Sequence, residues 1–398
     1  MKYFKFLFKI FFYLILIPIA LTIILIKPII HFRFGIIKSS KFGALIGSIV
    51  NYEIQNKEKK NLSKLSFNFY AYDSVIINTQ LKKMFSRKYK IFSFNYFFKY
   101  IPKLLKYISR GDTFSAQKVI LIRSQDLEKL ALKNILNFNE KELENGNLLL
   151  SQLNIENNVS FVCINNRDDY HLKKVYPDQN WDHHDYRNFA VKTLLPAAEE
   201  FVKSNFYAVR YGSDAKEKLI SKNNKIIDYT FSGKRSDFLD IYLAYKSKAY
   251  FGSNSGTSAV FQLFGKPTFC INCSLTLLNV HMKSHAGLFL TKHLYNKKTK
   301  KFIGLKQMFD LGINNFAKTD KFESFQVSNI SNSEEELKNF AIESIKHLEG
   351  DKTLTREDQK LQDCFWKIYF QNEKNFNKDE LKIQISPSFL RNNQYLLD

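Results

Sequence analysis

The feature that most restricts the possible folds is a regular alternation of short apolar segments and amphipathic segments between residues 159 and 272. Strands are predicted at 159–165, 206–212, 225–230, 248–253 and 267–272, and helices at 188–204, 236–247 and 255–264. Strands that alternate with helices at this spacing indicate βαβ units, so we expect an α/β fold with a parallel sheet. A less regular series, with strands at 29–35, 66–72 and 118–124 and a helix at 128–138, predicts another α/β domain before it.

The chain therefore divides into four predicted parts. Residues 1–28 form a membrane anchor, 29–155 an N-terminal Rossmann-like domain, 156–330 a C-terminal Rossmann-like domain, and 331–398 a helical tail. The Asn- and Glu-rich segment 139–158 is interpreted as a linker or loop region, with a structured part at 147–153. The tail holds two capped helical patterns, and the first of them ends before Gly350, a natural residue just after a helix.

The anchor is predicted from an uncharged run of 17 residues, Ile10 to Ile26, which follows three lysines and contains Pro18. Such a run is at the short end for a spanning helix, and residues 4–26 together approach the usual length. A signal peptide is disfavoured because no small-residue cleavage site follows, and a buried core helix fits a pure apolar run poorly. Basic residues flank both sides, so spanning and one-sided insertion both stay open.

A second stretch, residues 82–110, carries nine Lys or Arg and nine Phe or Tyr without one acidic residue. This composition suits a segment on an anionic bilayer surface, and single-stranded nucleic acid would use the same chemistry. We expect the membrane because of the apolar run upstream. An exposed helix whose composition reflects codon bias is the plainer alternative.

The formal net charge of +22 invites a nucleic-acid interpretation. The chain is also rich in Asn, Ile and Phe, which indicates an AT-rich genome and weakens that argument, so we expect no nucleic-acid partner. Four cysteines do not form a disulfide framework. Cys270 and Cys273 form a C-x-x-C without a second ligand pair, and a metal role for them is disfavoured.

Polar residues gather after the predicted strands of the C-terminal domain. Arg167 and Asp168 follow the first strand, and Arg210 and Gly212 lie at the end of the second. The fourth strand runs into Ser253, Asn254, Ser255, Gly256 and Thr257 at the start of a helix. In doubly wound sheets ligands lie beyond the carboxyl ends of the strands, and arginines with a helix N-terminus favour phosphate. The simpler alternative is that Ser255 only caps the helix.

Several other chemistries lack their motifs. Neither G-x-x-x-x-G-K-[ST] nor G-x-G-x-x-G is present, and no G-x-S-x-G marks a serine hydrolase. The stretch 182–185 and the pair His281 and His285 are weak metal candidates, so no metal site is predicted. The absence of D-x-D disfavours a metal-dependent sugar-nucleotide transferase of the single-domain type.

The segments 161–170, 184–213, 226–243 and 251–272, with 354–366 and 386–393, resemble a family of bacterial glycosyltransferases found with surface-polysaccharide genes. The resemblance extends over about residues 29–395 and implies the two-domain GT-B fold, a nucleotide-sugar donor held by the C-terminal domain, and no cofactor or required metal. It matches Arg187 and Asn188 to the Arg-Asn pair of the family, and Arg167, Asp168, Arg210, Gly212 and Ser253 to Gly256 to its other motifs. One family histidine is missing, because Lys41-Phe42-Gly43-Ala44 stands where the family tends to carry Arg-Ile-Gly-His.

The resulting prediction is a membrane-associated, metal-independent glycosyltransferase at the bacterial inner membrane, with its catalytic domains on the cytoplasmic side. It would move a sugar from a nucleotide sugar to a glycan or lipid-linked acceptor in surface-polysaccharide synthesis. Arg167, Arg210 and the Ser253–Thr257 turn would neutralise the donor diphosphate, and Asp168 and Glu53 are candidate catalytic bases. A sugar-nucleotide epimerase on the same fold and a non-catalytic membrane-bound glycan-assembly or glycan-binding protein remain alternatives.

Overall fold

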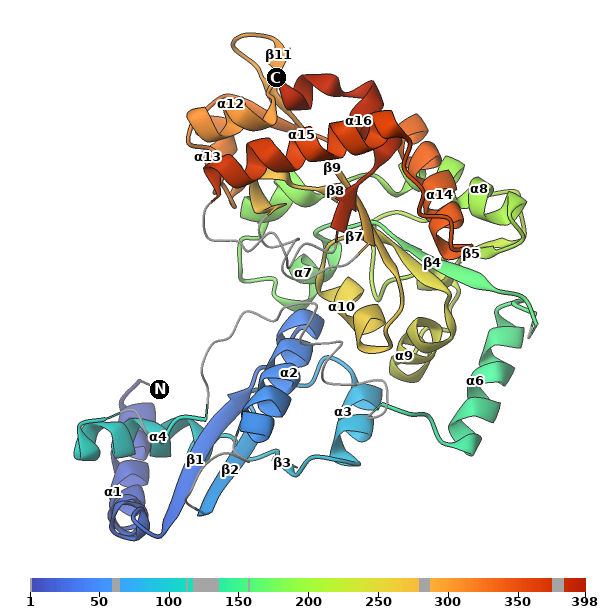
Figure 1. Cartoon of the computed structure of the whole chain (residues 1–398). Coiled ribbons are helices and arrows are strands. Elements are labelled where there is room, and N and C mark those ends of the chain that lie inside the picture. Colours follow the sequence, from blue (N-terminus) through green and yellow to red (C-terminus); the bar gives the residue numbers. More distant parts are fainter. Residues whose placement is uncertain are drawn as a thin grey trace. The chain divides into compact units, whose positions relative to one another are not determined.

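A computed structural model of the chain describes residues 2–58, 65–111, 114–116, 136–156, 158–278, 287–373 and 383–398. The chain forms two compact units, Met1–Asn137 and Phe138–Asp398, and each is an α/β structure with a parallel sheet (Figure 1). The α/β class is therefore confirmed. The predicted boundaries at residues 28, 155 and 330 stay predictions.

The second unit is built on a seven-stranded sheet in which every pairing is parallel. Its strands are β4 (Phe161–Asn165), β5 (Tyr207–Arg210), β6 (Ile226–Asp228), β7 (Ala249–Ser253), β8 (Thr268–Cys273), β9 (Gly287–Thr291) and β13 (Ile383–Ile385). The first five match the strands predicted from the alternation, because buried parallel strands are short, continuous apolar runs.

The order of these strands indicates where a ligand would bind. They lie in the order β13-β9-β8-β7-β4-β5-β6, so the chain builds outward from β4 in one direction and then continues on its other side from β7. This is the doubly wound order 3-2-1-4-5-6 with one added edge strand. The direction reverses between β4 and β7, and ligands of such sheets bind in the crevice at the carboxyl ends of the two central strands.

Both faces of the sheet are covered, as a parallel sheet requires (Figure 1). Phe251 of β7 packs on one face against Phe201 of α8 (Leu195–Lys203) and Phe340 of α14 (Glu334–Leu348). Its neighbour Tyr250 packs on the opposite face against Phe261 of α10 (Gly256–Leu263). Successive side chains of a strand point to opposite faces, so these pairs fix the register of β7 between two helical layers.

Further helices complete the second unit. They are α7 (Tyr170–Val175), α9 (Asp237–Lys246), α12 (Leu305–Asp310), α13 (Thr319–Ser324), α15 (Arg356–Asn372) and α16 (Pro387–Asn392). A small antiparallel sheet joins β10 (His293–Asn296) to β11 (Lys301–Phe302) and β12 (Val327–Ile330).

The predicted helical tail packs into the core of this unit. Helix α14 begins with a capping box between Ser333 and Glu336, and Gly350 follows its end with a φ of 94°. Phe365 of α15 and Leu390 of α16 are fully buried in the same apolar cluster as the sheet. The tail is therefore part of the structure that supports the sheet.

The segment 139–158 is helical over a longer part than predicted: the structured part expected at 147–153 lies in the helix and its C-cap residue, and the residues before it, expected as linker or loop, are helical too. Residues Glu140–Gln152 form helix α6, which begins with a capping box between Asn139 and Glu142. Gly146 lies against Tyr242 of α9, where a Cβ atom would approach the ring to 2.2 Å. Asn139 and Glu142 cap the start of this helix, and Gly146 allows it to pack closely against α9.

The first unit contains a three-stranded parallel sheet of β1 (Ile30–Ile37), β2 (Leu65–Tyr72) and β3 (Ile91–Phe92). Its helices are α1 (Lys2–Ile26), α2 (Phe42–Glu58), α3 (Thr79–Ser86) and α4 (Tyr96–Ser109). The predicted strands at 29–35 and 66–72 are confirmed as β1 and β2. The strand at 118–124 lies outside the described residues, as does nearly all of the helix at 128–138.

The prediction of an N-terminal membrane helix is wrong. Within the described ranges, no helix combines the length and the apolar character that crossing a bilayer needs. Three apolar side chains of α1, Leu16, Ala20 and Ile23, are instead buried in a cluster that includes Phe98 and Ile101 of α4. The apolar run thus serves protein packing along one of its sides, and the inner-membrane location inferred from it falls with it.

The basic and aromatic stretch 82–110 also has a packing role. It forms part of α3, all of β3 and α4, and Phe98, Ile101 and Leu105 of α4 are buried within the first unit. Lys99 and Lys103 of α4 are exposed. Packing inside the first unit therefore explains the buried aromatic and aliphatic residues of α4 without a membrane. It does not explain the exposed lysines.

Candidate anion-binding site

Cationic side chains meet at the position where the strand order reverses. Arg167 follows β4, Ser253 and Asn254 lie at the end of β7, and Lys292 follows β9. A cavity of about 110 Å³ lies here, lined by Arg167, Arg187, Ser253, Asn254, Asn272, Cys273, Ser274 and Leu277. Of the residues predicted to converge on one sheet edge, Arg167, Ser253 and Asn254 line this cavity, whereas Arg210 and the residues from Ser255 to Thr257 are not among its lining residues.

Arg167 is held by uncharged oxygen atoms. Its Nη1 donates to the backbone oxygen of His184 at 3.2 Å and to the side-chain oxygen of Asn188. Burial and the nearby charge of Arg187 lower the pKa of Arg167 to about 10, although Asp185 and Asp168 act in the opposite direction. The guanidinium thus carries its charge in a place that disfavours positive charge.

Two further cations share this environment. The Nη2 of Arg187 donates to the backbone oxygen of Asn254 at 2.7 Å, and Nζ of Lys292 donates to the backbone oxygen of Asn188 at 2.7 Å. Lys292 is 1% exposed, and burial together with Arg167 and Arg187 lowers its pKa to about 8. In the described part of the chain, no ion pair joins any of the three cations to a carboxylate. One buried and two half-buried cations that lie close together without a direct ion pair favour the binding of an anion, although the carboxylates of Asp185 and Asp168 lie near enough to act on Arg167.

The helix start after β7 is a cap in this structure. The Oγ of Ser255 accepts from the backbone N–H of Thr257 at 3.3 Å, so the capping interpretation of this residue is confirmed. Ser253 lines the cavity and lies 3.4 Å from the Oδ1 of Asn165. Ser255, Gly256 and Thr257 are not among the lining residues of the cavity, and a contact between them and phosphate stays a prediction.

Arg210 occupies a different environment from the other arginines. Its side chain is 2% exposed and pairs with Asp228 at 3.3 Å. It also donates to the backbone oxygen of Glu217 at 3.1 Å and to the Oδ1 of Asn166 at 3.0 Å. Its charge therefore has an internal partner, and its predicted contact with a diphosphate remains untested. Gly212 accepts through its backbone oxygen from Thr230 at 3.2 Å.

A second cavity of about 340 Å³ borders the same edge and is lined by Asn166, Asp168, Asp169, Asp185, Asn188, Phe189, Ala190, Val191, Lys216 and Glu217. The carboxylate of Asp168 accepts from the backbone N–H of Tyr170 at 3.1 Å through Oδ1 and from that of Lys216 at 3.0 Å through Oδ2. The candidate base Glu53 lies in the first unit, where it pairs with Lys88 at 3.2 Å. The catalytic role of either carboxylate stays a prediction.

An acidic group near this cavity brings Asp169, Asp182 and Asp185 together, with carboxylate oxygens within 4.8 Å of one another. The Nζ of Lys173 lies 2.5 Å from Asp169 and 3.1 Å from Asp182, so one ammonium group already contacts two of the three carboxylates. The pair His281 and His285 lies outside the described residues. Cys270 and Cys273 are buried free thiols of β8.

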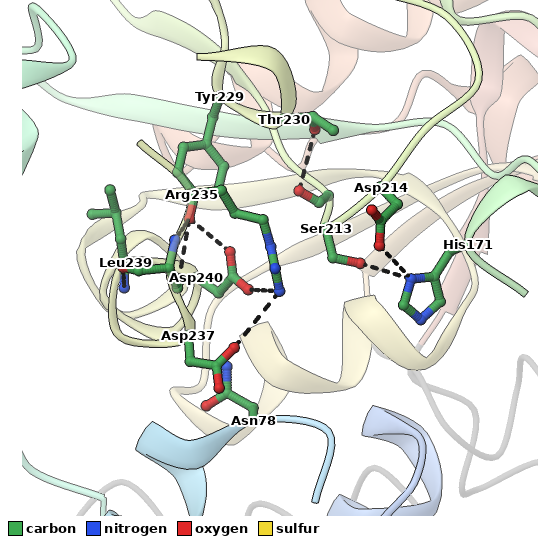
Figure 2. Close-up of polar contacts among 12 residues, drawn as sticks. Asn78, His171, Ser213, Asp214, Tyr229, Thr230, Arg235, Asp237, Leu239 and Asp240 are labelled. Atoms are coloured by element: carbon green, nitrogen blue, oxygen red, sulfur yellow. Dashed lines mark hydrogen bonds and ion pairs between the residues drawn. The ribbon is translucent and has the colours of Figure 1, made fainter. Parts of the chain in front are cut away.

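A polar network fixes the first turn of α9 beside this edge (Figure 2). The hydroxyl of Tyr229 donates to Asp240 at 2.7 Å, and Nη2 of Arg235 lies 2.9 Å from the other carboxylate oxygen. Burial raises the pKa of Asp240 to about 6, although Arg235 and Tyr229 oppose this change. The network is internal to the protein and holds the helix in place.

Sequence reasoning missed Lys292. Lys292 directly follows β9, and Arg167 lies two residues after the end of β4, so the rule that located the arginines would also have located Lys292. The strand β9 was not predicted because its segment, Gly287–Thr291, lies beyond the regular alternation and begins at a glycine with a φ of 111°.

Comparisons with known proteins give weak likenesses. No known protein family matches the sequence by its profile, and no curated protein matches it significantly. The structure of E. coli ADP-heptose lps heptosyltransferase II is similar at 9% identity over 60% of this chain and 84% of that chain, with a TM-score of 0.35. That of a glycosyl transferase family 9 from Veillonella parvula is similar at 10% identity over 60% and 79%, with a TM-score of 0.34.

Proposed function

We propose that the chain is a glycosyltransferase that binds the diphosphate of a nucleotide sugar at the carboxyl edge of the seven-stranded sheet. The observation that carries this proposal is the cluster of Arg167, Arg187 and Lys292, three cations bonded to neutral oxygens at the switch point of a doubly wound sheet. A diphosphate has several negatively charged oxygens that can accept hydrogen bonds from these cations. In the ligand-free protein the cations have only uncharged oxygens as hydrogen-bond partners among the described residues.

The cluster also suits the departure of a nucleoside diphosphate. When the bond between the anomeric carbon and the phosphate oxygen breaks, the electron pair moves to the phosphate and increases its negative charge. Fixed cations in a buried place stabilise that charge more strongly than water would, because they need no reorganisation. In this scheme Arg167 and Lys292 neutralise the leaving group, and the sugar occupies the larger cavity. A glycan or a lipid-linked glycan is the expected acceptor.

A thermal-shift screen with nucleotide sugars tests the proposal. UDP-, GDP- and ADP-linked sugars carry a diphosphate, whereas a CMP-linked sugar carries one phosphate, so we expect a diphosphate donor to stabilise the protein most. Ligand at 100 times its Kd stabilises the folded state by about 2.7 kcal/mol. Arg187→Met should abolish the shift, and Lys306→Met, which removes an exposed lysine of α12, should retain it. Transfer is then detected by mass spectrometry of labelled products.

The proposal fails if no nucleotide sugar in the panel stabilises the wild-type protein. It also fails if the shift is the same in Arg187→Met as in the control, because binding would then occur elsewhere.

A further inference from the structure

We propose that His171 is the catalytic base that removes the proton from the acceptor hydroxyl, with Asp214 and Ser213 as its positioning residues. The inference rests on the proposed glycosyl transfer and assigns the group that this reaction still lacks. It starts from Asp168, because both oxygens of that carboxylate already accept backbone N–H groups.

These two bonds of Asp168 join the segments that meet at His171. One bond holds Tyr170 at the start of α7, next to His171, and the other holds Lys216, two residues after Asp214. The same segments contribute Asp168, Lys216 and Glu217 to the wall of the larger cavity. Asp168 thus joins the segment that carries His171 to the segment that carries Ser213 and Asp214, and both segments reach the wall of this cavity, although these three residues are not among its lining residues.

The imidazole is oriented through one ring nitrogen. Its Nδ1 lies 2.9 Å from Oδ2 of Asp214 and 3.1 Å from Oγ of Ser213, while Figure 2 shows the other ring nitrogen pointing away from both. A carboxylate only accepts hydrogen bonds, so Nδ1 carries a hydrogen, and in the neutral ring Nε2 then holds the lone pair. The His171 side chain is 30% exposed, which leaves it reachable by a substrate.

The charges around this pair keep Asp214 ionised. Burial raises the pKa of Asp214, but hydrogen bonds from Lys174 and His171 outweigh it, and the pKa is lowered overall. Lys174 lies 2.5 Å from the other oxygen of Asp214, and Tyr170 and Arg235 are the further charged or titratable groups near Lys174. The carboxylate therefore stays available to stabilise the imidazolium that forms when His171 takes up a proton.

The step is a single displacement. The Nε2 lone pair of His171 takes the proton of the acceptor hydroxyl as its oxygen forms a bond to the anomeric carbon. The bond from that carbon to the phosphate oxygen breaks, and its electron pair leaves with the nucleoside diphosphate at the cation cluster. Products are the glycosylated acceptor, the nucleoside diphosphate and a protonated His171, and the configuration at the anomeric carbon inverts.

The experiment measures turnover and donor binding separately in His171→Ala, Asp214→Asn and a control, His347→Gln on α14. Turnover is followed as release of nucleoside diphosphate from the donor found by the thermal-shift screen, with water and simple alkyl glycosides as acceptors. We expect His171→Ala to lower kcat by about 10²- to 10⁴-fold with donor Kd unchanged, and Asp214→Asn to lower kcat by less. Added imidazole should restore part of the activity of His171→Ala, because free base can enter the space left by the side chain.

Each outcome decides the matter. Unchanged kcat in His171→Ala overturns the assignment. A loss that imidazole does not restore, or one accompanied by weaker donor binding, shows a structural role instead and also overturns it. If the wild-type protein binds the donor but shows no turnover, the catalytic role of His171 is refuted. If the wild-type protein binds no donor, the proposed function itself is refuted.

Discussion

Substitution of Lys292 distinguishes most clearly between a role in ligand binding and a role in stabilising the fold. Its ammonium is buried beside Arg167 and Arg187 and has no carboxylate partner among the described residues. A methionine of similar length would keep the apolar stem and remove the charge. We expect Lys292→Met to stabilise the ligand-free protein and to weaken its binding of diphosphate.

The magnitude follows from the pKa of Lys292. The value of about 8, against an ordinary 10.5, corresponds to about 3 kcal/mol of disfavoured charge, since one pH unit is about 1.4 kcal/mol. The hydrogen bond to the oxygen of Asn188 is lost in the variant and offsets about 1 kcal/mol of the gain. The free energy of unfolding should therefore rise by about 2 kcal/mol. Loss of a charged hydrogen bond to phosphate should weaken affinity by roughly tenfold to a hundredfold.

The charge of Lys292 makes both the free energy of unfolding and the affinity for diphosphate depend on pH in a definite direction. The pKa of Lys292 is lowered in the folded state, so the unfolded state binds more protons between pH 8 and 10.5. The free energy of unfolding of the wild type should rise across that window relative to Lys292→Met. Affinity for diphosphate should fall as pH rises through about 8, because Lys292 then loses its charge.

Urea unfolding and calorimetric titration with inorganic pyrophosphate measure both quantities, with Lys306→Met as the control. The reasoning is refuted if Lys292→Met is less stable than the wild type while its affinity for pyrophosphate is unchanged. That pair of results would mean that the ammonium supports the fold.

Two further predictions concern the internal ion pairs. Arg210→Met should lower the free energy of unfolding by about 3–5 kcal/mol, because it leaves the carboxylate of Asp228 buried and unpaired; adding Asp228→Asn should recover part of the loss, and full stability of Arg210→Met in urea would contradict the assignment. Asp240 has a pKa raised to about 6 from an ordinary 3.8, so the folded state binds more protons between these values, and the wild type should lose stability from about pH 4 to 6 relative to Asp240→Asn. Equal slopes in pH-dependent unfolding of these two proteins would refute the second prediction.

Sequence reasoning succeeded where local signals decide the structure. The run of strands and helices from 159 to 272 has its own periodicity and caps, and each predicted strand is present. The grouping of Arg167 with Ser253 and Asn254 followed from one rule about parallel sheets and is also present. The first result follows from the local residue pattern of each segment. The second follows from the general rule that the carboxyl ends of parallel strands lie at the same edge of a sheet.

It failed where the partner of a residue decides its role. Arg167 and Arg210 both lie near the carboxyl ends of strands, but only the fold shows that Asp228 contacts Arg210 while Arg167 contacts neutral oxygens. In the same way, the apolar run of α1 has the composition of a membrane segment, and its contacts with α4 are made across about 80 residues of sequence. Long-range pairing of this kind leaves no trace in local composition.

The position of β13 has a consequence for synthesis of the chain. Residues 383–385 supply the edge strand that pairs with β9, although β9 itself is made about a hundred residues earlier. Until the segment at 383–385 has emerged, the backbone groups of β9 on that side have no strand to pair with, and an open apolar edge favours association with other chains. A nascent chain of this protein is therefore most exposed to aggregation late in translation, when most of its core sequence has already been made.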